Sequence, residues 1–284
     1  YIAKSEAFQR YLPELQRQNA QQEFYLTDII SIAREDGRRV EALKAFERVA
    51  RGVNTQKELA DASWYLYQKK RNELMEAGVI LISPSQVYIE ESVEIGAGCV
   101  IYPGAYLRGR TVLGAYTVVE PNCVIQDSRI GQNVQLKAGS YLVGSEVGAQ
   151  SEIGPYAHLR EGSQIGQNCK IGNFVETKKI QFGDGSKAGH LSYLGDAVIG
   201  KNVNVGCGTI TANYALDRQK YITRIGDNTF VGSDTQFVAP VEIGCDAVIA
   251  CGSTVTDNVP DRALAIARSR QVTKEQFVTP KSSE

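Results

Sequence analysis

Histidine is scarce in this chain of 284 residues, which contains only His158 and His190. A zinc carbonic anhydrase site needs three histidine ligands, so a chain with two histidines cannot form such a site. The six cysteines form no C-x-x-C pair, and their spacing is typical of neither a zinc site nor a disulfide framework. We therefore expect a protein of a reducing, cytoplasmic compartment.

An excess of charge of one sign is also absent, because 31 Lys and Arg balance 32 Asp and Glu to a net charge of -1. Such a chain has no long-range attraction to nucleic acid or to an anionic membrane, so local charges must hold any anionic ligand. Apolar runs such as Val79 to Ile82 are far shorter than the roughly 20 residues that cross a bilayer, and no signal-peptide pattern opens the sequence. We expect small-molecule partners.

What the chain does contain is a repeat with a period of six residues, in which a large aliphatic residue recurs. The first run consists of Ile89, Ile95, Ile101, Leu107, Leu113, Val119 and Ile125. After slips of one residue the repeat continues through residues 130–142 and 147–171, and later through residues 194–205 and 225–255. Neither the helical period of 3.6 nor the strand period of 2 produces this spacing, whereas a fixed structural repeat does.

Short strands joined by tight turns, three to a coil, form a parallel β-helix, so the chain is expected to be mainly β. At about 18 residues to a coil, residues 79–260 hold roughly ten coils.

Two further features accompany the repeat. Small residues stand four positions after the aliphatic ones, and we expect them to be buried, with the cysteines acting as small hydrophobes at Cys99, Cys123 and Cys169. Glycine often follows the aliphatic residue, as at Gly96 and Gly114, and we expect it to supply the dihedral angles of a sharp turn.

Residues 1–78 lack the repeat and predict helices instead. Thr27 and Asp28 are candidate caps of an apolar-patterned helix. Thr55 and Glu58 form a capping-box pattern, which predicts a long helix over about residues 55–77. The expected organisation is a remnant of a larger domain, a helical linker and a β-helix with a C-terminal arm, over residues 1–54, 55–78 and 79–284.

Residues 211–224 interrupt the repeat, and the coils before them carry Arg160, Lys178 and His190. A flat face of a three-sided β-helix offers no concave pocket, so an insertion or a neighbouring subunit is needed to form one. Taken singly, these side chains are also typical of a solvated cationic face or a structural hydrogen bond. Their joint placement favours a functional site.

Six strings of the chain resemble one protein family. They are GPYAHLR, IGNFVETKK, KAGHLSYLGDA, NVNVGCGTITANY, VGSDTQFVAPVEIG and ALAIARSRQV, in that order. The family is that of the bifunctional N-acetylglucosamine-1-phosphate uridyltransferase / glucosamine-1-phosphate N-acetyltransferase, and the strings resemble its acetyltransferase domain. NAQQEFYLTD and RGVN are similar to the end of its uridyltransferase domain. The resemblance implies a left-handed β-helix after a linker helix and a remnant of an α/β nucleotidyltransferase domain.

The resemblance also implies a reaction, the transfer of acetyl from acetyl-CoA to the amine of glucosamine-1-phosphate. The product, N-acetylglucosamine-1-phosphate, serves the synthesis of UDP-N-acetylglucosamine, a precursor of peptidoglycan and lipopolysaccharide. The general base falls on His190, and imidazole suits that role because it accepts a proton near neutral pH. The sugar-phosphate contacts fall on Arg160, Lys178, Tyr193 and Asn204.

Acetyl-CoA contacts are implied as well. They fall on Asn213, Tyr214, Ser233, Arg268 and, after a shift of one residue in the loop, Lys220. Cys207 and Cys251 stand where the family has alanine beside acetyl-CoA. The resemblance further implies a homotrimer with sites between subunits.

Uridyl transfer is expected only of a full-length parent. No glycine-rich triphosphate loop appears, and Asn54 matches a Mg²⁺-associated asparagine without its usual aspartate. Two alternatives stay open. One is another hexapeptide acyltransferase, acting on a serine hydroxyl or a nucleotide-sugar amine, and the other is a non-catalytic structural or regulatory β-helix.

Overall fold

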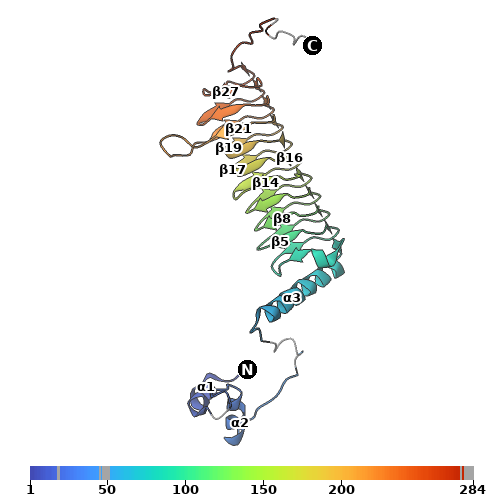
Figure 1. Ribbon diagram of the computed structural model, residues 1–284, viewed down its shortest axis with the longest axis vertical. Helices are drawn as coiled ribbons and strands as arrows, with labels where there is room; N and C mark the ends of the chain where they lie inside the picture. The colour runs from blue at the N-terminus through green and yellow to red at the C-terminus, as the bar shows by residue number, and fades with distance from the viewer. Residues whose placement is uncertain (18–19, 45, 47–51, 276, 278–284) are drawn as a thin grey trace, which may run out of the picture. The chain divides into compact units, whose positions relative to one another are not determined.

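The computed structural model describes residues 1–17, 20–44, 46, 52–275 and 277, and the chain divides into two compact units, Tyr1–Gln56 and Lys57–Glu284 (Figure 1). The first unit contains the helix α1 (Ser5–Tyr11), the 3₁₀ turn η1 (Leu12–Glu14) and the helix α2 (Asp28–Glu35). Tyr11 packs with Ile29 and Ala33 in a small apolar cluster. The cap expected at Thr27 is not formed, because Thr27 is itself helical and its side chain makes no cap hydrogen bond.

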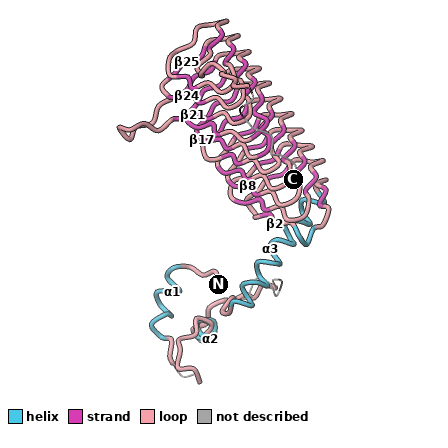
Figure 2. The backbone as a smooth tube through the Cα atoms, turned by 45° about the horizontal axis from the view of Figure 1, so that its top comes forward, coloured by secondary structure: helices cyan, strands magenta, loops and turns pink. Residues whose placement is uncertain are grey.

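The long helix α3 (Gln56–Glu76) lies within one residue, at each end, of the range predicted from the capping pattern. It leads into the first coil of the second unit (Figure 2). Its residue Leu74 belongs to the buried core of that unit. Arg71 is also buried and donates from Nη1 to the carbonyl oxygen of Val87 over 3.0 Å. Neither α3 nor any other described helix is long and apolar enough to cross a membrane.

The second unit is a solenoid of short strands in parallel register, which confirms the predicted mainly β fold of hexapeptide repeats. Its strands stack in three faces. Face 1 is an 11-stranded sheet of β1 (Ile80–Leu81), β4 (Val100–Ile101), β7 (Val118–Val119), β10 (Gln135–Leu136), β13 (Glu152–Ile153), β16 (Lys170–Asn173), β18 (Lys187–His190), β20 (Asn204–Val205), β23 (Phe230–Val231), β26 (Val248–Ile249) and β28 (Leu264–Ala265).

Faces 2 and 3 together form a 17-stranded sheet, because two long strands bend around the edge between them. Face 2 contains β2 (Tyr88–Ile89), β5 (Tyr106–Arg108), β8 (Val124–Gln126), β11 (Tyr141–Val143), β14 (His158–Leu159), β21 (Ile210–Ala212), β24 (Gln236–Val238) and β27 (Thr254–Val255). Face 3 contains β3 (Glu94–Ile95), β6 (Val112–Leu113), β9 (Arg129–Ile130), β12 (Glu146–Val147), β15 (Ser163–Ile165), β22 (Thr223–Ile225) and β25 (Val241–Ile243). The bending strands are β17 (Glu176–Phe182) and β19 (Tyr193–Ile199).

The aliphatic residues of the repeat form the core, as predicted. Most are fully buried, and so are the small residues that follow them, including the three cysteines expected inside. Where the repeat fades between Ile171 and Leu194, its inward positions are still occupied, by Thr177, Phe182 and Ala188. The solenoid therefore continues without a break through that segment.

The reason given above for the recurrent glycines is wrong. Gly96 and Gly114 do not adopt the left-handed backbone that a sharp turn would require. A Cβ on Gly114 would instead lie 2.5 Å from the backbone nitrogen of Gln132 in the next coil. These glycines are needed because the next coil packs directly against them.

The insertion is shorter than the predicted range of 211–224. Thr211 and Thr223 are buried strand residues, and the loop proper comprises residues 213–222 (the 213–222 loop). It projects from the solenoid beside β21 (Figure 1). An antiparallel bridge between Tyr214 and Lys220 closes it as a hairpin.

Candidate functional site

His190 begins a row of predicted site residues along one edge of the solenoid. Asn173 and His190 are register partners. Val205, Val231 and Ile249 are register partners in successive coils. The residues two positions after them, Cys207, Ser233 and Cys251, therefore follow His190 at the same edge position, one coil apart. Parallel strands lie about 4.8 Å apart, so the predicted base and three predicted acetyl-CoA contacts form one continuous row. We call these five residues the His190 row.

The orientation of the His190 ring is set by Asn173. Nδ1 of His190 lies 2.5 Å from Oδ1 of Asn173. An amide oxygen only accepts hydrogen bonds, so Nδ1 carries the hydrogen and Nε2 keeps its lone pair. His190 is exposed in the single chain. Asn173 was missed from the sequence, although it stands in the string IGNFVETKK, one coil before the histidine.

Two predicted cations lie on face 2. Nη1 of Arg160 donates to Oε1 of Glu176 over 2.8 Å, and both side chains are about two-fifths exposed. The register of Leu159 with Thr177 places Arg160 beside Lys178 in the next coil. Two cations one coil apart suit a phosphate monoester, with arginine as a fork and lysine as a point charge.

Tyr193 follows on the same face, as the register partner of Glu176. Its hydroxyl lies 2.5 Å from the position that a Cβ of Gly195 would take, so glycine at 195 leaves room for the tyrosine ring. Gly195 is in turn the register partner of Lys178. The structure thus brings Tyr193 and the two cations together on face 2.

Asn204 is not brought to that face. It opens β20 on face 1, is exposed, and has Lys187 and Phe230 as register partners. A single chain therefore does not gather all four predicted sugar-phosphate contacts on one surface.

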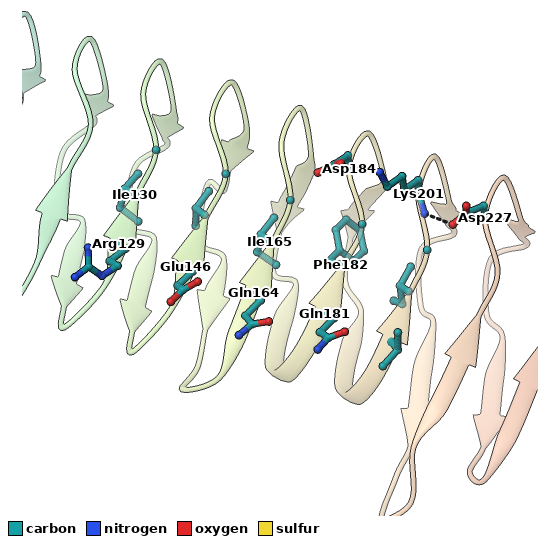
Figure 3. Close-up of a pocket in the computed structure, with 18 of the residues that line it drawn as sticks. Arg129, Ile130, Glu146, Gln164, Ile165, Gln181, Phe182, Asp184, Lys201 and Asp227 are labelled. Atoms are coloured by element: carbon teal, nitrogen blue, oxygen red, sulfur yellow. Dashed lines mark hydrogen bonds and ion pairs between the residues drawn. The ribbon is translucent and has the colours of Figure 1, made fainter.

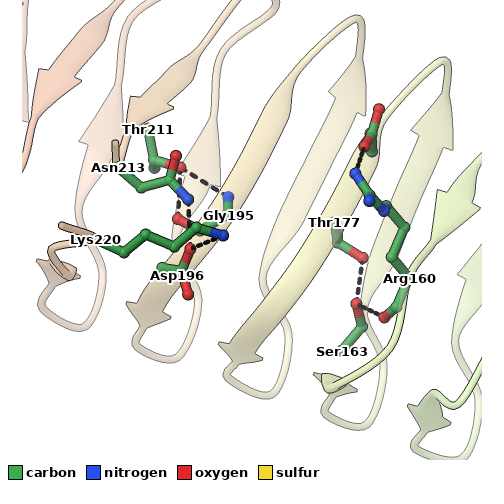
Figure 4. A network of polar contacts seen from close by, with 9 residues as sticks. Arg160, Ser163, Thr177, Gly195, Asp196, Thr211, Asn213 and Lys220 are labelled. Atoms are coloured by element: carbon green, nitrogen blue, oxygen red, sulfur yellow. Dashed lines mark hydrogen bonds and ion pairs between the residues drawn. The ribbon is translucent and has the colours of Figure 1, made fainter. Parts of the chain in front are cut away.

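The 213–222 loop carries three more of the predicted acetyl-CoA residues, Asn213, Tyr214 and Lys220. Asn213, which is 7% exposed, donates from Nδ2 to Oδ2 of Asp196. Lys220 extends along the same carboxylate, with its Nζ 3.7 Å from Oδ2 (Figure 4). Tyr214 is exposed, and the Cδ of Arg268 comes within 3.8 Å of where a Cβ of Gly252 would stand, one residue beyond the His190 row.

Asn54 belongs to the first unit. Across the described ranges no group of three or more His, Cys, Asp and Glu side chains could hold a metal ion. Mg²⁺ is usually held by one or two carboxylates together with substrate phosphates, whereas Asn54 offers only an amide, so Asn54 by itself does not make a site for the ion.

A groove of about 850 Å³ runs along a different edge, beside face 3. The outward side chains of Arg129, Glu146, Gln164 and Gln181 follow it on successive strands (Figure 3). Its floor is a column of glycines at 131, 148, 166, 183 and 200, which are bare because the next coil leaves no space for a Cβ. The groove follows from coil stacking, and none of the predicted site residues lines it.

Known proteins are similar to this chain over most of its length. The profile of the GMPPB C-terminal domain matches residues 83–175, and that of the hexapeptide repeat of succinyl-transferase matches residues 222–257. The curated relative named Bifunctional protein GlmU from Bdellovibrio bacteriovorus is 54% identical over 98% of this chain and 60% of its own length. A protein of the same name from Carboxydothermus hydrogenoformans is 46% identical over 98% of this chain and 62% of its own length.

Over nearly its whole length, this chain is similar to proteins named GlmU. The resemblance stated from the sequence strings is thereby confirmed. The chain spans about 60% of the length of these GlmU relatives. Among solved structures, it is similar to the UDP-N-acetylglucosamine acyltransferase from Campylobacter jejuni, at 20% identity and a TM-score of 0.48, over 66% of this chain and 71% of that chain.

Proposed function

We propose that this chain transfers acetyl from acetyl-CoA to the amine of glucosamine-1-phosphate, in the pathway to UDP-N-acetylglucosamine. The observation that carries the proposal is the His190 row, in which an imidazole oriented by Asn173 begins a line of three predicted donor contacts. The high identity to GlmU proteins over nearly the whole chain supports it.

The histidine acts as general base. The acceptor attacks as a neutral amine, its ammonium form having lost one proton to solvent, and its nitrogen must lose a second proton as it bonds to the thioester carbon. Nε2 of His190 takes that proton while the carbon–sulfur bond breaks. The imidazolium then returns the proton to the departing thiolate of CoA.

The remaining residues bind and orient. Arg160 and Lys178 hold the phosphate of the acceptor, with Tyr193 and Asn204 on its sugar. On the donor side, backbone contacts at Cys207 and Cys251 would tolerate a thiol where the family has alanine. The other donor contacts are Asn213, Tyr214, Lys220, Ser233 and Arg268.

The chain acts as a homotrimer in the cytoplasm. A neighbouring subunit completes each site. What supports this is that His190 and Asn204 are exposed and that Asn204 lies on a different face from the cations. Beside the His190 row, Tyr156, Phe174 and Leu191 have left-handed backbones and are 59%, 56% and 58% exposed. Exposed apolar side chains grouped in this way are typical of a surface that another subunit covers.

Mg²⁺-dependent uridyl transfer from UTP stays an expectation for a full-length parent only. We do not extend the proposal to it, because the sequence contains no glycine-rich triphosphate loop.

The test is release of CoA thiol when the purified chain receives acetyl-CoA and glucosamine-1-phosphate. Glucosamine without the phosphate, a nucleotide-sugar amine and free serine serve as comparison acceptors. Preference for glucosamine-1-phosphate supports the proposal. Preference for another acceptor identifies a different hexapeptide acyltransferase, and no release from a correctly assembled trimer identifies a non-catalytic β-helix. Sedimentation gives the oligomeric state, and a fully active monomer would contradict the shared site.

A further inference from the structure

The 213–222 loop is attached to three consecutive residues of β19. Where it leaves the solenoid, the hydroxyl of Thr211 accepts from the backbone nitrogen of Gly195 over 2.7 Å and donates to the carbonyl oxygen of Gly195 over 2.9 Å. Where it returns, Thr223 is the register partner of Ala197. Asp196 stands between these two attachment points, so its side chain faces the root of the loop.

The carboxylate of Asp196 holds both ends of that root. It is only 14% exposed, accepts from the amide of Asn213, and lies 3.7 Å from Nζ of Lys220 (Figure 4). Asn213 is the first residue of the loop, and Lys220 lies on its returning strand. One carboxylate oxygen, Oδ2, therefore joins the two strands of the hairpin to the solenoid.

The other described bonds of the loop are internal. The backbone nitrogen of Tyr221 donates to the carbonyl oxygen of Asn213 over 2.9 Å, and the hydroxyl of Tyr221 donates to Asp217 over 2.6 Å. The backbone nitrogen of Ala215 donates to the carbonyl oxygen of Gln219 over 3.0 Å. These bonds give the hairpin its shape but do not fix its direction relative to the solenoid.

We propose that Asp196 is a positioning residue that sets the direction of the 213–222 loop and thereby presents Asn213 and Tyr214 to the acetyl-CoA donor. This role rests on the proposed function. This role needs no contact between Asp196 and either substrate, because it acts through the loop residues that its Oδ2 engages. Because Gly195 neighbours Lys178 and Tyr193, the same segment of β19 also links the loop to the acceptor side.

Two substitutions separate the contacts. Asp196→Asn keeps an oxygen for the amide of Asn213 but removes the charge that attracts Lys220, whereas Asp196→Ala removes both. We expect the KM for acetyl-CoA to rise about threefold in the first variant, as for a partly exposed ion pair, and about tenfold or more in the second. We expect kcat and the KM for glucosamine-1-phosphate to stay within about twofold of wild type.

Trypsin cleavage gives a readout that needs no activity. Arg218 and Lys220 are trypsin sites within the loop, so release of the loop should raise their rate of cleavage, most in Asp196→Ala. Asp184→Asn is the matched control, because Asp184 pairs with Lys201 over 3.3 Å at another edge and should change neither readout.

The two hypotheses fail in different ways. If the wild-type chain is inactive but trypsin still cleaves Asp196→Ala faster than wild type, the role of Asp196 in placing the loop is upheld and the proposed function is overturned. Wild-type cleavage and an unchanged KM for acetyl-CoA in Asp196→Asn and Asp196→Ala would overturn the positioning role. An equal rise of both KM values would also overturn it, since that result indicates a general structural role.

Discussion

Oδ1 of Asn173 lies 2.5 Å from Nδ1 of His190, across two strands that are neighbours in the solenoid. Seventeen residues separate the two in sequence, which is one coil. The bond leaves Nε2 as the basic nitrogen and directs it away from the strand that supplies the asparagine. The spacing of the repeat thus sets the orientation of the ring that we propose as the base.

Removal of the base should abolish most turnover. We expect His190→Ala to lower kcat by about 10²–10⁴, the usual contribution of a general base, with little change in the KM for acetyl-CoA. Steady-state thiol release measures both quantities. Unchanged kcat would show that another group takes the proton.

Replacement of Asn173 by aspartate should shift the pH profile in a defined direction. A carboxylate at Nδ1 favours the protonated ring, so His190 would stay protonated, and inactive as a base, to higher pH. We expect the rising limb of kcat in Asn173→Asp to move up by about one pH unit. Asn202→Asp, at another edge, is the control. A shift toward lower pH would contradict this orientation of the ring.

Arg160→Lys should weaken binding of the phosphate alone. The charge is retained, but the forked geometry that matches phosphate oxygens is lost, so the KM for glucosamine-1-phosphate should rise about tenfold. Unphosphorylated glucosamine should react at the same rate with either protein. Arg129→Lys, on face 3, controls for a general effect of the exchange. Equal losses with both acceptors would place Arg160 away from the phosphate.

The core was predictable from the sequence because each inward position contributes to the same column. Ile101 and Val119 needed only their spacing to be recognised. Thr177 was not recognised as a core residue, because a polar hydroxyl does not indicate an inward position in the sequence. Its hydroxyl is buried because it forms a hydrogen bond of 2.8 Å with the hydroxyl of Ser163. The role of Gly114 was also mistaken, since the approach of the next coil is a tertiary contact with no local signal.

The site divides in the same way. His190 and Arg160 were predicted from strings that resemble the family, and their roles stay predictions. Asn173 and Asp196 were not, because each acts on a residue of the adjacent coil, and that pairing depends on register. Single-residue slips in the repeat change the register, so the sequence alone did not reveal which residues would meet.

Thiol reagents should distinguish two classes of cysteine. Cys207, Cys245 and Cys251 are exposed and should react in the native protein. The other three are buried, and burial raises the pKa of Cys99 and Cys169 and raises that of Cys123 to about 11. A raised pKa leaves these groups as neutral thiols at pH 7 to 8, so they should react only after unfolding.

Activity should follow the modification of Cys207, which is the neighbour of His190 in the row. We expect acetyl-CoA to slow inactivation by a maleimide, and Cys207→Ala to slow it further. Cys245→Ala is the matched control, since Cys245 is also exposed to solvent but lies at a different edge. Inactivation of Cys207→Ala at the wild-type rate would remove Cys207 from the donor site.

Two glycine substitutions test whether coil stacking explains the glycine column. A Cβ on Gly183 would lie 2.4 Å from the carbonyl oxygen of Gly200, a backbone atom that cannot move aside alone, whereas a Cβ on Gly189 would meet nothing within 4 Å. Neither glycine has a left-handed backbone, so strain in φ does not enter the comparison. We expect Gly183→Ala to lower the free energy of unfolding by about 1–3 kcal/mol, as overpacking does. Gly189→Ala should leave it unchanged or raise it by about 0.5 kcal/mol through the stiffer unfolded chain. Urea midpoints of the two variants measure the difference, and equal midpoints would mean that the column of glycines has another cause.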